Sequence, residues 1–313
     1  MKRLTLLLLI CLSAALSAAG QTLSGTYVFA RRDTCDLRLD IYEPVPGSVS
    51  ADGPDRPSIL FVFGGGFVSG RRDDAYFLPW FKLLTENGYR VISIDYRLGL
   101  KGVRMRFDPL HLIDAADKTK HAVDIGVEDV FSAVRYLADH AAELGVDMGN
   151  IVIAGSSAGA MISLSSEWEI CNGTPRTAVL PLDFNFVGVM SFAGAIMSDE
   201  GVPAYRSLAP CPQLLIHGTA DGAVAYDKTA FGRRGMFGSS AVAEVLARNG
   251  YVYNIYRFKD HSHDMAANFI ATWPEQRRFL EENVMGGNRR VIDAMVDDPA
   301  VPVMGNITLD DIY

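Results

Sequence analysis

The stretch of residues 151–165, IVIAGSSAGAMISLS, constrains the fold more than any other part of the chain. Its first four residues are apolar and predict a buried strand, and the small residues from Gly159 onward suit a helix. Between them lies a Gly-x-Ser-x-Gly turn centred on Ser157. At a strand-to-helix junction such a turn is sharp and strained, and glycines flank the serine because side chains there would clash. The segment therefore predicts a serine whose hydroxyl projects above the end of a central strand.

Length and charge narrow the kinds of protein that this chain can be. With 313 residues, of which 49% are hydrophobic, it can bury the core of one large α/β domain or of two modest ones. The formal net charge is -8, and no run of basic residues is longer than a pair. A nucleic-acid-binding surface is therefore not expected.

The N-terminus has the pattern of a secretory signal peptide. Lys2 and Arg3 precede an apolar run at residues 4–12, and small residues follow at 13–20. We expect cleavage near Ala19-Gly20 or Gly20-Gln21, and a secreted or periplasmic protein. The apolar run is too short to span a bilayer, so a stable membrane span is not expected.

The cysteines allow a disulfide but do not show a metal-binding pattern. Export allows disulfides, and Cys35, Cys171 and Cys211 remain after the signal peptide. At most one bridge can form among three cysteines, and the sequence does not choose the pair. Neither C-x-x-C nor H-E-x-x-H occurs, so we expect no metal and no cofactor.

The order of apolar segments predicts an α/β fold with a mostly parallel sheet of about eight strands and helices on both faces. A hairpin at 26–32 and 37–42 opens the sheet, and a C-terminal extension follows from about Gly286, so that 21–313 is one domain. The segment 99–120 is predicted to be a long loop near the mouth of the site, and 101–120 and 169–183 are expected to shape the pocket. The other predicted strands are 59–63, 90–95, 151–154, 186–192, 213–216 and 252–258, and the predicted helices are 76–87, 122–144, 239–249 and 264–283, the last interrupted near Trp273-Pro274.

A serine hydroxyl needs a general base and a third group that orients the base. Asp221 follows the strand at 213–216 and His263 follows the strand at 252–258, so both are expected at the carboxyl ends of strands, where Ser157 also lies. The order serine, aspartate, histidine suits this fold. The alternatives are Asp227 as the acid and His261 as the base, whereas His217 is interpreted as a packed, hydrogen-bonded histidine.

The motifs FGGGF, DYRL, GSSAG, HGTAD and HSHD occur in this order, and with them the chain resembles α/β-hydrolase serine esterases of the carboxylesterase and hormone-sensitive-lipase-like kind. The resemblance implies that Ser157 is the nucleophile, Asp221 the orienting acid and His263 the base. It also implies that the N–H groups of Gly65, Gly66 and Ala158 bind the oxyanion of the tetrahedral intermediate. One such donor contributes roughly 3 to 4 kcal/mol to lowering the barrier.

One position departs from the family pattern. The family usually has a histidine where Phe63 stands, and that histidine braces the glycine loop. We expect a different brace, such as aromatic packing by Phe63 and Phe67, or an oxyanion hole that is assembled only when substrate is present.

The sequence thus predicts a hydrolase of small-molecule or carbohydrate esters that works through an acyl-enzyme, with short acyl chains as one option. Its activity should rise as the pH passes about 6.5, the ordinary pKa of an imidazole. Two alternatives remain: a serine exopeptidase of the same fold, and a binding protein that has lost catalysis. Proteins of the second kind usually lack the serine or the histidine, whereas Ser157 and His263 are both present.

Overall fold

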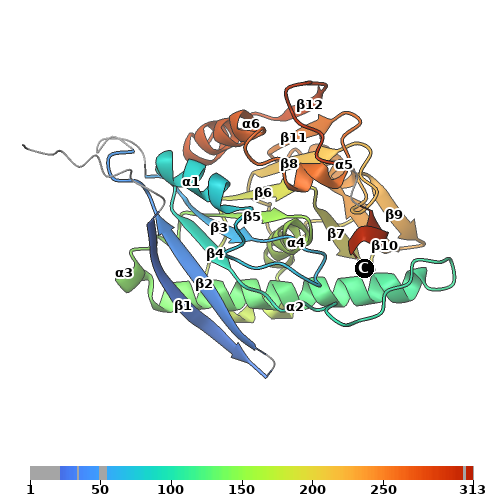
Figure 1. Ribbon diagram of the computed structural model, residues 1–313, viewed down its shortest axis with the longest axis horizontal. Coiled ribbons are helices and arrows are strands. Elements are labelled where there is room, and N and C mark those ends of the chain that lie inside the picture. The colour runs from blue at the N-terminus through green and yellow to red at the C-terminus, as the bar shows by residue number, and fades with distance from the viewer. Residues whose placement is uncertain (1–21, 34, 49–54, 306–307, 313) are drawn as a thin grey trace, which may run out of the picture.

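The computed structural model describes residues 22–33, 35–48, 55–305 and 308–312, so the predicted signal peptide lies outside the described residues. Within them a nine-stranded sheet has the order β1-β2-β4-β3-β5-β6-β8-β11-β12 (Figure 1). β1 and β2 pair antiparallel, as does β2 with β4, and the strands from β4 to β12 in this order pair in parallel. The bounds are β1 (Thr22–Arg32), β2 (Cys35–Glu43), β3 (Ser58–Val62), β4 (Val91–Ile94), β5 (Ile151–Ser156), β6 (Gly188–Phe192), β8 (Gln213–Gly218), β11 (Tyr253–Phe258) and β12 (Ile292–Val296).

The predicted α/β class with a mostly parallel sheet is confirmed, and β12 adds an edge strand in the segment that was expected to be an extension. Central strands such as β3 and β5 are buried at every position, because helices cover both faces of the sheet. Figure 1 shows α2 (Leu112–Asp139) and α4 (Ala158–Asn172) on one side, and α1 (Leu78–Glu86) and α6 (Trp273–Arg278) on the other. The remaining helices are α3 (Ala141–Leu144), η1 (Pro175–Val179), α5 (Ser239–Arg248), η2 (His263–Ala266), η3 (Phe279–Met285) and α7 (Leu309–Ile312).

Two of the predicted elements are wrong in part. α2 begins at Leu112, so the second half of the expected loop 99–120 is helical. Its first turns expose Leu112 and Ile113 and therefore lack the apolar periodicity that marks a helix packed on a core. The closing helix starts at Trp273 rather than at 264, and Pro274 lies in its first turn, where the missing N–H costs nothing.

A second, three-stranded sheet was not predicted. It consists of β7 (Ala195–Ser198), β10 (Arg234–Gly238) and β9 (Lys228–Phe231), in the order β7-β10-β9 and antiparallel throughout. All four residues of β9 are exposed, so the strand shows no alternation of buried and exposed positions. An ion pair of 3.3 Å between Arg234 and Asp117 joins this sheet to α2.

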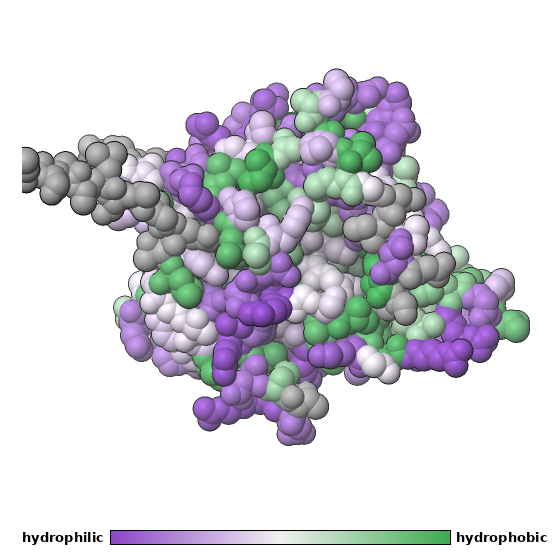
Figure 2. All heavy atoms as spheres, viewed as in Figure 1, coloured by the Kyte–Doolittle hydropathy of each residue, from purple (hydrophilic) through white to green (hydrophobic). Residues whose placement is uncertain are grey.

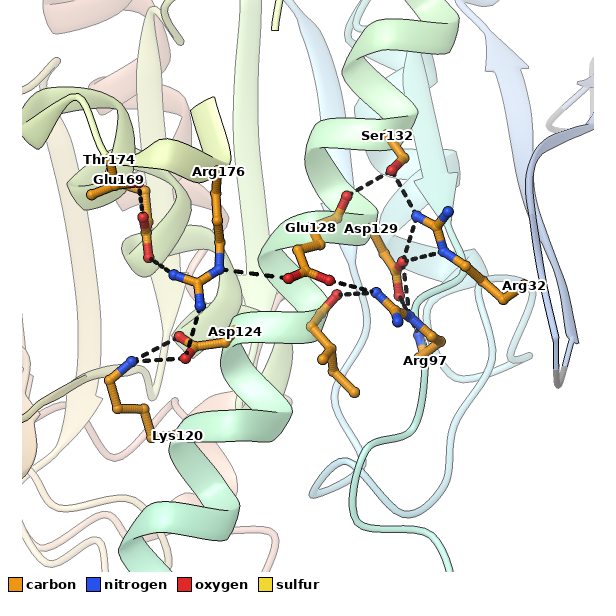
Figure 3. Close-up of polar contacts among 11 residues, drawn as sticks. Arg32, Arg97, Lys120, Asp124, Glu128, Asp129, Ser132, Glu169, Thr174 and Arg176 are labelled. Carbon is orange, nitrogen blue, oxygen red and sulfur yellow. Dashed lines mark hydrogen bonds and ion pairs between the residues drawn. The ribbon is translucent and has the colours of Figure 1, made fainter. Parts of the chain in front are cut away.

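Ion pairs hold α2 in place (Figure 3). Asp129 is buried, and its carboxylate accepts hydrogen bonds from Arg97 Nε at 2.9 Å and from Arg32 at 3.1 Å. On another side of the helix, Arg176 of η1 lies among three carboxylates, those of Asp124, Glu128 and Glu169. These contacts tie α2 to β1, to the segment after β4 and to η1. They matter for the site because the N-terminal half of α2 forms part of a pocket described below.

No disulfide joins Cys35, Cys171 and Cys211 to one another. The two buried ones meet at Glu167 of α4. The Oε1 atom of Glu167 accepts hydrogen bonds from the Cys211 N–H at 2.8 Å and from Cys171 Sγ at 3.3 Å, while Oε2 has no partner among the described residues. Burial raises the pKa of Glu167, and these donors offset only part of that effect.

Glu167→Gln should therefore stabilise the fold at neutral pH. The unfolded carboxyl ionises above about pH 4.3, whereas the folded one stays protonated to a higher pH. Between the two pKa values the free energy of unfolding of the wild type falls by about 1.4 kcal/mol per pH unit, a loss that the glutamine variant does not share. In thermal unfolding, the Tm advantage of Glu167→Gln should grow from about pH 4 upward. Glu244→Gln, exposed on α5, is the control, and an equal Tm difference at acid and neutral pH would contradict the prediction.

Candidate active site

Ser157 lies in the turn between β5 and α4. Its φ of 51° is in the left-handed region, which is strained for a residue with a side chain. The flanking glycines allow this turn because a Cβ at Gly155 would lie 2.2 Å from the carbonyl oxygen of Gly159, and one at Gly159 only 2.0 Å from that of Val62. The turn holds its position because the Ser157 N–H donates to the Phe192 carbonyl at 2.8 Å. The strand, the turn and the helix thus present the hydroxyl at the carboxyl end of the sheet.

His263 and Asp221 extend a chain of hydrogen bonds from this hydroxyl. Ser157 Oγ lies 2.7 Å from His263 Nε2, and His263 Nδ1 lies 2.8 Å from Asp221 Oδ2. The other carboxylate oxygen of Asp221 accepts the N–H groups of Ala223 and Val224, both at 2.9 Å. With Nδ1–H donated to Asp221, Nε2 is free to take the proton of Ser157.

The environment of Asp221 keeps it ionised. Burial would raise the pKa of this carboxyl, but the hydrogen bonds from His217 and His263 outweigh burial and hold the pKa well below its usual range. A carboxylate that remains charged fixes the tautomer of the neighbouring imidazole and stabilises the imidazolium that forms when it takes a proton.

The loops that carry Asp221 and His263 are in direct contact. The Ala220 N–H donates to the His261 carbonyl at 2.9 Å. A Cβ at Gly218 would lie 2.3 Å from the carbonyl oxygens of both His261 and Ser262, so the HGTAD motif needs glycine at this position. The close approach of the two backbones sets the distance between the acid and the base.

The alternative acid and base lie elsewhere. The Nδ1 atom of His261 is 2.9 Å from Asp264 Oδ2, so this histidine is committed to Asp264 and not to Ser157. Asp264 Oδ1 also accepts the Ser262 N–H at 2.8 Å, which shapes the loop around His263. The backbone carbonyl of Asp227 accepts the Gly238 N–H at 2.6 Å, so this residue contacts the start of α5 through its backbone.

The expected oxyanion donors lie in part beside Ser157. Gly66 and Ala158 line the same pocket as Ser157, whereas Gly65 is not among the described residues that line it. Ala158 begins α4, so its N–H is one of those that a helix leaves without an intrahelical acceptor. Gly65 also shapes the loop: its φ is 126°, its carbonyl accepts the N–H groups of Val68 and Ser69 at 3.1 Å, and a Cβ there would lie 2.2 Å from the Ser69 carbonyl oxygen.

Ser157 opens into a cavity of about 510 Å³, within the usual range for small-molecule sites. Its walls come from α2, α4, the β9–β10 hairpin and α7. Figure 2 shows apolar and charged side chains mixed at the end of the molecule where the segment before α2 and this hairpin lie. No lining residue belongs to the segment 169–183, so that predicted contribution to the pocket is wrong. The apolar lining residues are Phe67, Phe107, Leu112, Ile113, Ala115, Ala116, Ala158, Met161, Met197, Ala223, Val224, Ala225, Ala230, Phe231, Met236, Leu309 and Ile312.

A family model for the carboxylesterase family matches residues 17–167, which include the glycine loop and Ser157. Esterase LipI of Mycobacterium tuberculosis is 32% identical over 112 residues, which are 36% of this chain and 29% of LipI. Juvenile hormone esterase of Heliothis virescens is 33% identical over 120 residues, which are 37% of this chain and 19% of that protein. The matches thus span less than a third of these relatives' length.

Solved structures of esterase 2 from Thermogutta terrifontis share the fold. The butyrate-bound form aligns with a TM-score of 0.57 and 24% identity, covering 83% of this chain and 95% of that one. The chain has the α/β-hydrolase fold, and residues 17–167 are similar to the carboxylesterase family. At this level of identity the likeness establishes the fold, and the activity has to be argued from the site.

In this chain an aromatic contact lies where the similar family usually has a bracing histidine. The ring of Phe63 stacks on Tyr96, with ring centroids 4.5 Å apart, and the Tyr96 hydroxyl donates to the Phe63 carbonyl at 3.2 Å. The ring of Phe67, a residue with a φ of 64°, makes a T-shaped contact with the same tyrosine, with ring centroids 6.4 Å apart. The Phe67 carbonyl accepts the Leu100 N–H at 3.0 Å. Tyr96 therefore supports both ends of the glycine loop.

Sequence reasoning did not assign roles to Tyr96 or Asp264, although both lie in motifs that it singled out, DYRL and HSHD. Tyr96 contacts residues far along the chain, and Asp264 contacts residues across its own loop. A short motif does not reveal such contacts. Over the described part of the chain, no cluster of three or more histidine, cysteine, aspartate or glutamate residues could hold a metal ion. No helix in that part has the length and apolar character to cross a membrane.

Proposed function

We propose that this α/β-hydrolase is a serine esterase that cleaves carboxylic esters with a mainly apolar acyl or alcohol group. One observation carries the proposal: the hydrogen-bonded chain of Ser157, His263 and Asp221, with links of 2.7 and 2.8 Å, ends in an apolar cavity of about 510 Å³. The relation to carboxylesterases supports the same reaction.

In the proposed mechanism, Ser157 Oγ attacks the ester carbonyl carbon while His263 Nε2 takes its proton. The N–H groups of Gly65, Gly66 and Ala158 bind the oxyanion that forms. The C–O bond to the alcohol then breaks, and the alcohol leaves with the proton from His263. A water molecule, deprotonated by His263, hydrolyses the acyl-enzyme, releasing the acid and restoring Ser157. Asp221 stays ionised throughout and keeps His263 oriented.

The pocket favours hydrocarbon over sugar. Sugar hydroxyls need hydrogen-bond partners when they are buried, whereas the lining residues are mostly apolar. Arg234, a charged residue in the lining, pairs with Asp117 at 3.3 Å and with Asp199 at 3.7 Å. Structures of the Thermogutta esterase carry butyrate and propionate, so short acyl esters are a reasonable starting series.

The decisive assay compares p-nitrophenyl esters from acetate to laurate with an acetylated xylan and an aminoacyl p-nitroanilide. We expect turnover of the aryl esters and covalent labelling by a fluorophosphonate. Preference for the anilide would favour the exopeptidase alternative. A folded protein that is neither labelled nor active on any ester would favour the non-catalytic alternative and overturn the proposal.

We also propose that the protein is secreted or periplasmic, on the basis of the signal pattern in residues 1–20. Expression with the natural N-terminus should yield a mature protein that begins at Gly20 or Gln21, found outside the cytoplasm. Full-length protein retained in the cytoplasm of its own host would contradict this.

Leu309→Trp should shift the preference of the enzyme toward shorter acyl chains. Leu309 of α7 lines the cavity, and an indole there would fill space that a longer chain needs. The ratio of kcat/KM for octanoate to that for acetate should fall by about tenfold, since one or two excluded methylenes are worth about 1–3 kcal/mol. Val303→Trp is the control, because Val303 is exposed and does not line the cavity. An unchanged ratio in Leu309→Trp would show that α7 does not bound the substrate.

Tyr96→Leu should lower kcat by about tenfold or more with little effect on KM. The change removes both the ring that stacks on Phe63 and the hydroxyl that holds its carbonyl, so the oxyanion donors are less well preorganised. Tyr96→Phe keeps the stacking and should retain most of the activity. Michaelis parameters for both variants test this, and equal losses in the two would assign the effect to the hydroxyl alone.

A further inference from the structure

A second histidine contacts the same carboxylate oxygen as His263. His217 is fully buried at the end of β8, and its Nε2 lies 3.1 Å from Asp221 Oδ2, the atom that His263 Nδ1 approaches at 2.8 Å. With the N–H groups of Ala223 and Val224 on Oδ1, Asp221 accepts four hydrogen bonds. The proposed mechanism uses only the one from His263.

The other ring nitrogen of His217 shows which tautomer is present. His217 Nδ1 lies 2.8 Å from Ser239 Oγ, whereas the Gly194 carbonyl oxygen lies farther from this hydroxyl, at 3.4 Å. The hydroxyl therefore donates to Nδ1, and the ring proton is on Nε2. From there it points at Asp221 Oδ2 and at the Val224 carbonyl, 3.2 Å away. Ser239 begins α5, so this helix, which carries none of Ser157, His263 and Asp221, orients the ring that contacts Asp221.

The groups that face His217 include few charges. Asp221 and His263 lie on its Nε2 side, and the ring of Tyr226 packs edge-on with centroids 5.7 Å apart. Tyr226 Oη accepts a hydrogen bond from Arg257 of β11. His217 therefore meets Asp221 through its Nε2–H.

We infer that His217 is a positioning residue for ester hydrolysis: its Nε2–H, oriented by Ser239, holds Asp221 toward His263 and shares the negative charge of the carboxylate. The inference rests on the proposed function. Sharing the charge of Asp221 also affects how readily His263 is protonated. Without the His217 donor, the charge on Asp221 is less dispersed and stabilises a protonated His263 more strongly, so a higher pH is needed to free the base.

Three variants separate orientation from packing. His217→Leu removes the donor, and His217→Gln places an amide N–H near the position of Nε2. Ser239→Ala removes the hydroxyl that fixes the tautomer. His140→Leu is the matched control, because His140 stacks on Tyr136 at the far end of α2.

For His217→Leu we expect a loss of roughly 10- to 100-fold in kcat with little change in KM, because the acid is misplaced by a fraction of an ångström. The acid limb of the pH profile of kcat/KM should move up by about half a unit. His217→Gln should restore most of the rate and the wild-type profile, and Ser239→Ala should fall between the two. In proton NMR, the low-field signal of the His263–Asp221 hydrogen bond should shift in His217→Leu.

Equal losses in the glutamine and leucine variants, with pH profiles and low-field signals like those of the wild type, would make His217 a packing residue and overturn the inference. If His217→Leu does not fold, Ser239→Ala and His217→Gln carry the test, and a Ser239→Ala protein identical to wild type in rate and profile overturns it. These outcomes differ from failure of the proposed function, in which the wild type itself shows neither ester turnover nor fluorophosphonate labelling.

Discussion

Replacing Ser157 by alanine is expected to lower kcat/KM for aryl esters by about a million-fold, the scale seen when a serine nucleophile is removed. The variant should also lose fluorophosphonate labelling. Ser157 Oγ is the atom that His263 Nε2 approaches at 2.7 Å, so no acyl-enzyme can form without it. The variant should keep a small residual activity, because it still binds the ester beside the oxyanion donors. This activity should be measurable as a rate slightly above that of the uncatalysed reaction.

The matched control for this variant is Ser165→Ala. Ser165 is also buried on the segment that follows β5, and its Oγ has no hydrogen-bond partner among the described residues. Its removal should leave both rate and labelling unchanged. Ordinary turnover by purified Ser157→Ala would refute the esterase assignment, whereas loss of activity in both serine variants would indicate a folding defect.

Asp221→Asn is expected to lower kcat by about 10⁴-fold with a much smaller change in KM. The amide NH₂ can be turned toward His263, which favours the tautomer with the proton on Nε2 and leaves nothing to accept the proton of Ser157. Asp227→Asn, at the alternative acid position, should keep normal activity because its side chain makes no contact in this chain of hydrogen bonds. Steady-state kinetics of the two variants distinguish them, and a similar loss in Asp227→Asn would mean that the acid is wrongly assigned.

The same substitution has a pH-dependent effect on stability. The pKa of folded Asp221 lies below its unfolded value of about 3.9, so the charged carboxylate stabilises the fold above that pH. This stabilisation is lost as the pH falls toward the folded pKa. In thermal unfolding, wild type should therefore exceed Asp221→Asn at neutral pH, and the two Tm values should converge in acid. The low pKa also means that titration of Asp221 does not set the acid limb of the activity profile.

Much of the fold could be predicted from local patterns. Strands such as β3, β5 and β8 are buried at every position, so each appears in the sequence as a short continuous apolar run. The turn at Ser157 was predictable because the close approach of Val62 to Gly159 excludes any side chain there, and the motif records that exclusion. β9 was not predictable, because an exposed strand leaves no apolar periodicity in its sequence.

By itself, the sequence determined which segments are buried strands, where the chain turns sharply, and which residue types follow those strands, because these properties depend on neighbours a few positions away. The family resemblance implied His263 as the base, but only the tertiary structure brings it to Ser157 and pairs His261 with Asp264. It also places Tyr96 against the glycine loop and His217 beside the carboxylate of Asp221. The physical reason is that hydrogen bonds act over about 3 Å, so their partners are set by how distant loops converge. His261 and His263 lie in the same short motif, and the contact of the His261 backbone with the Ala220 N–H helps to set which of them faces the serine.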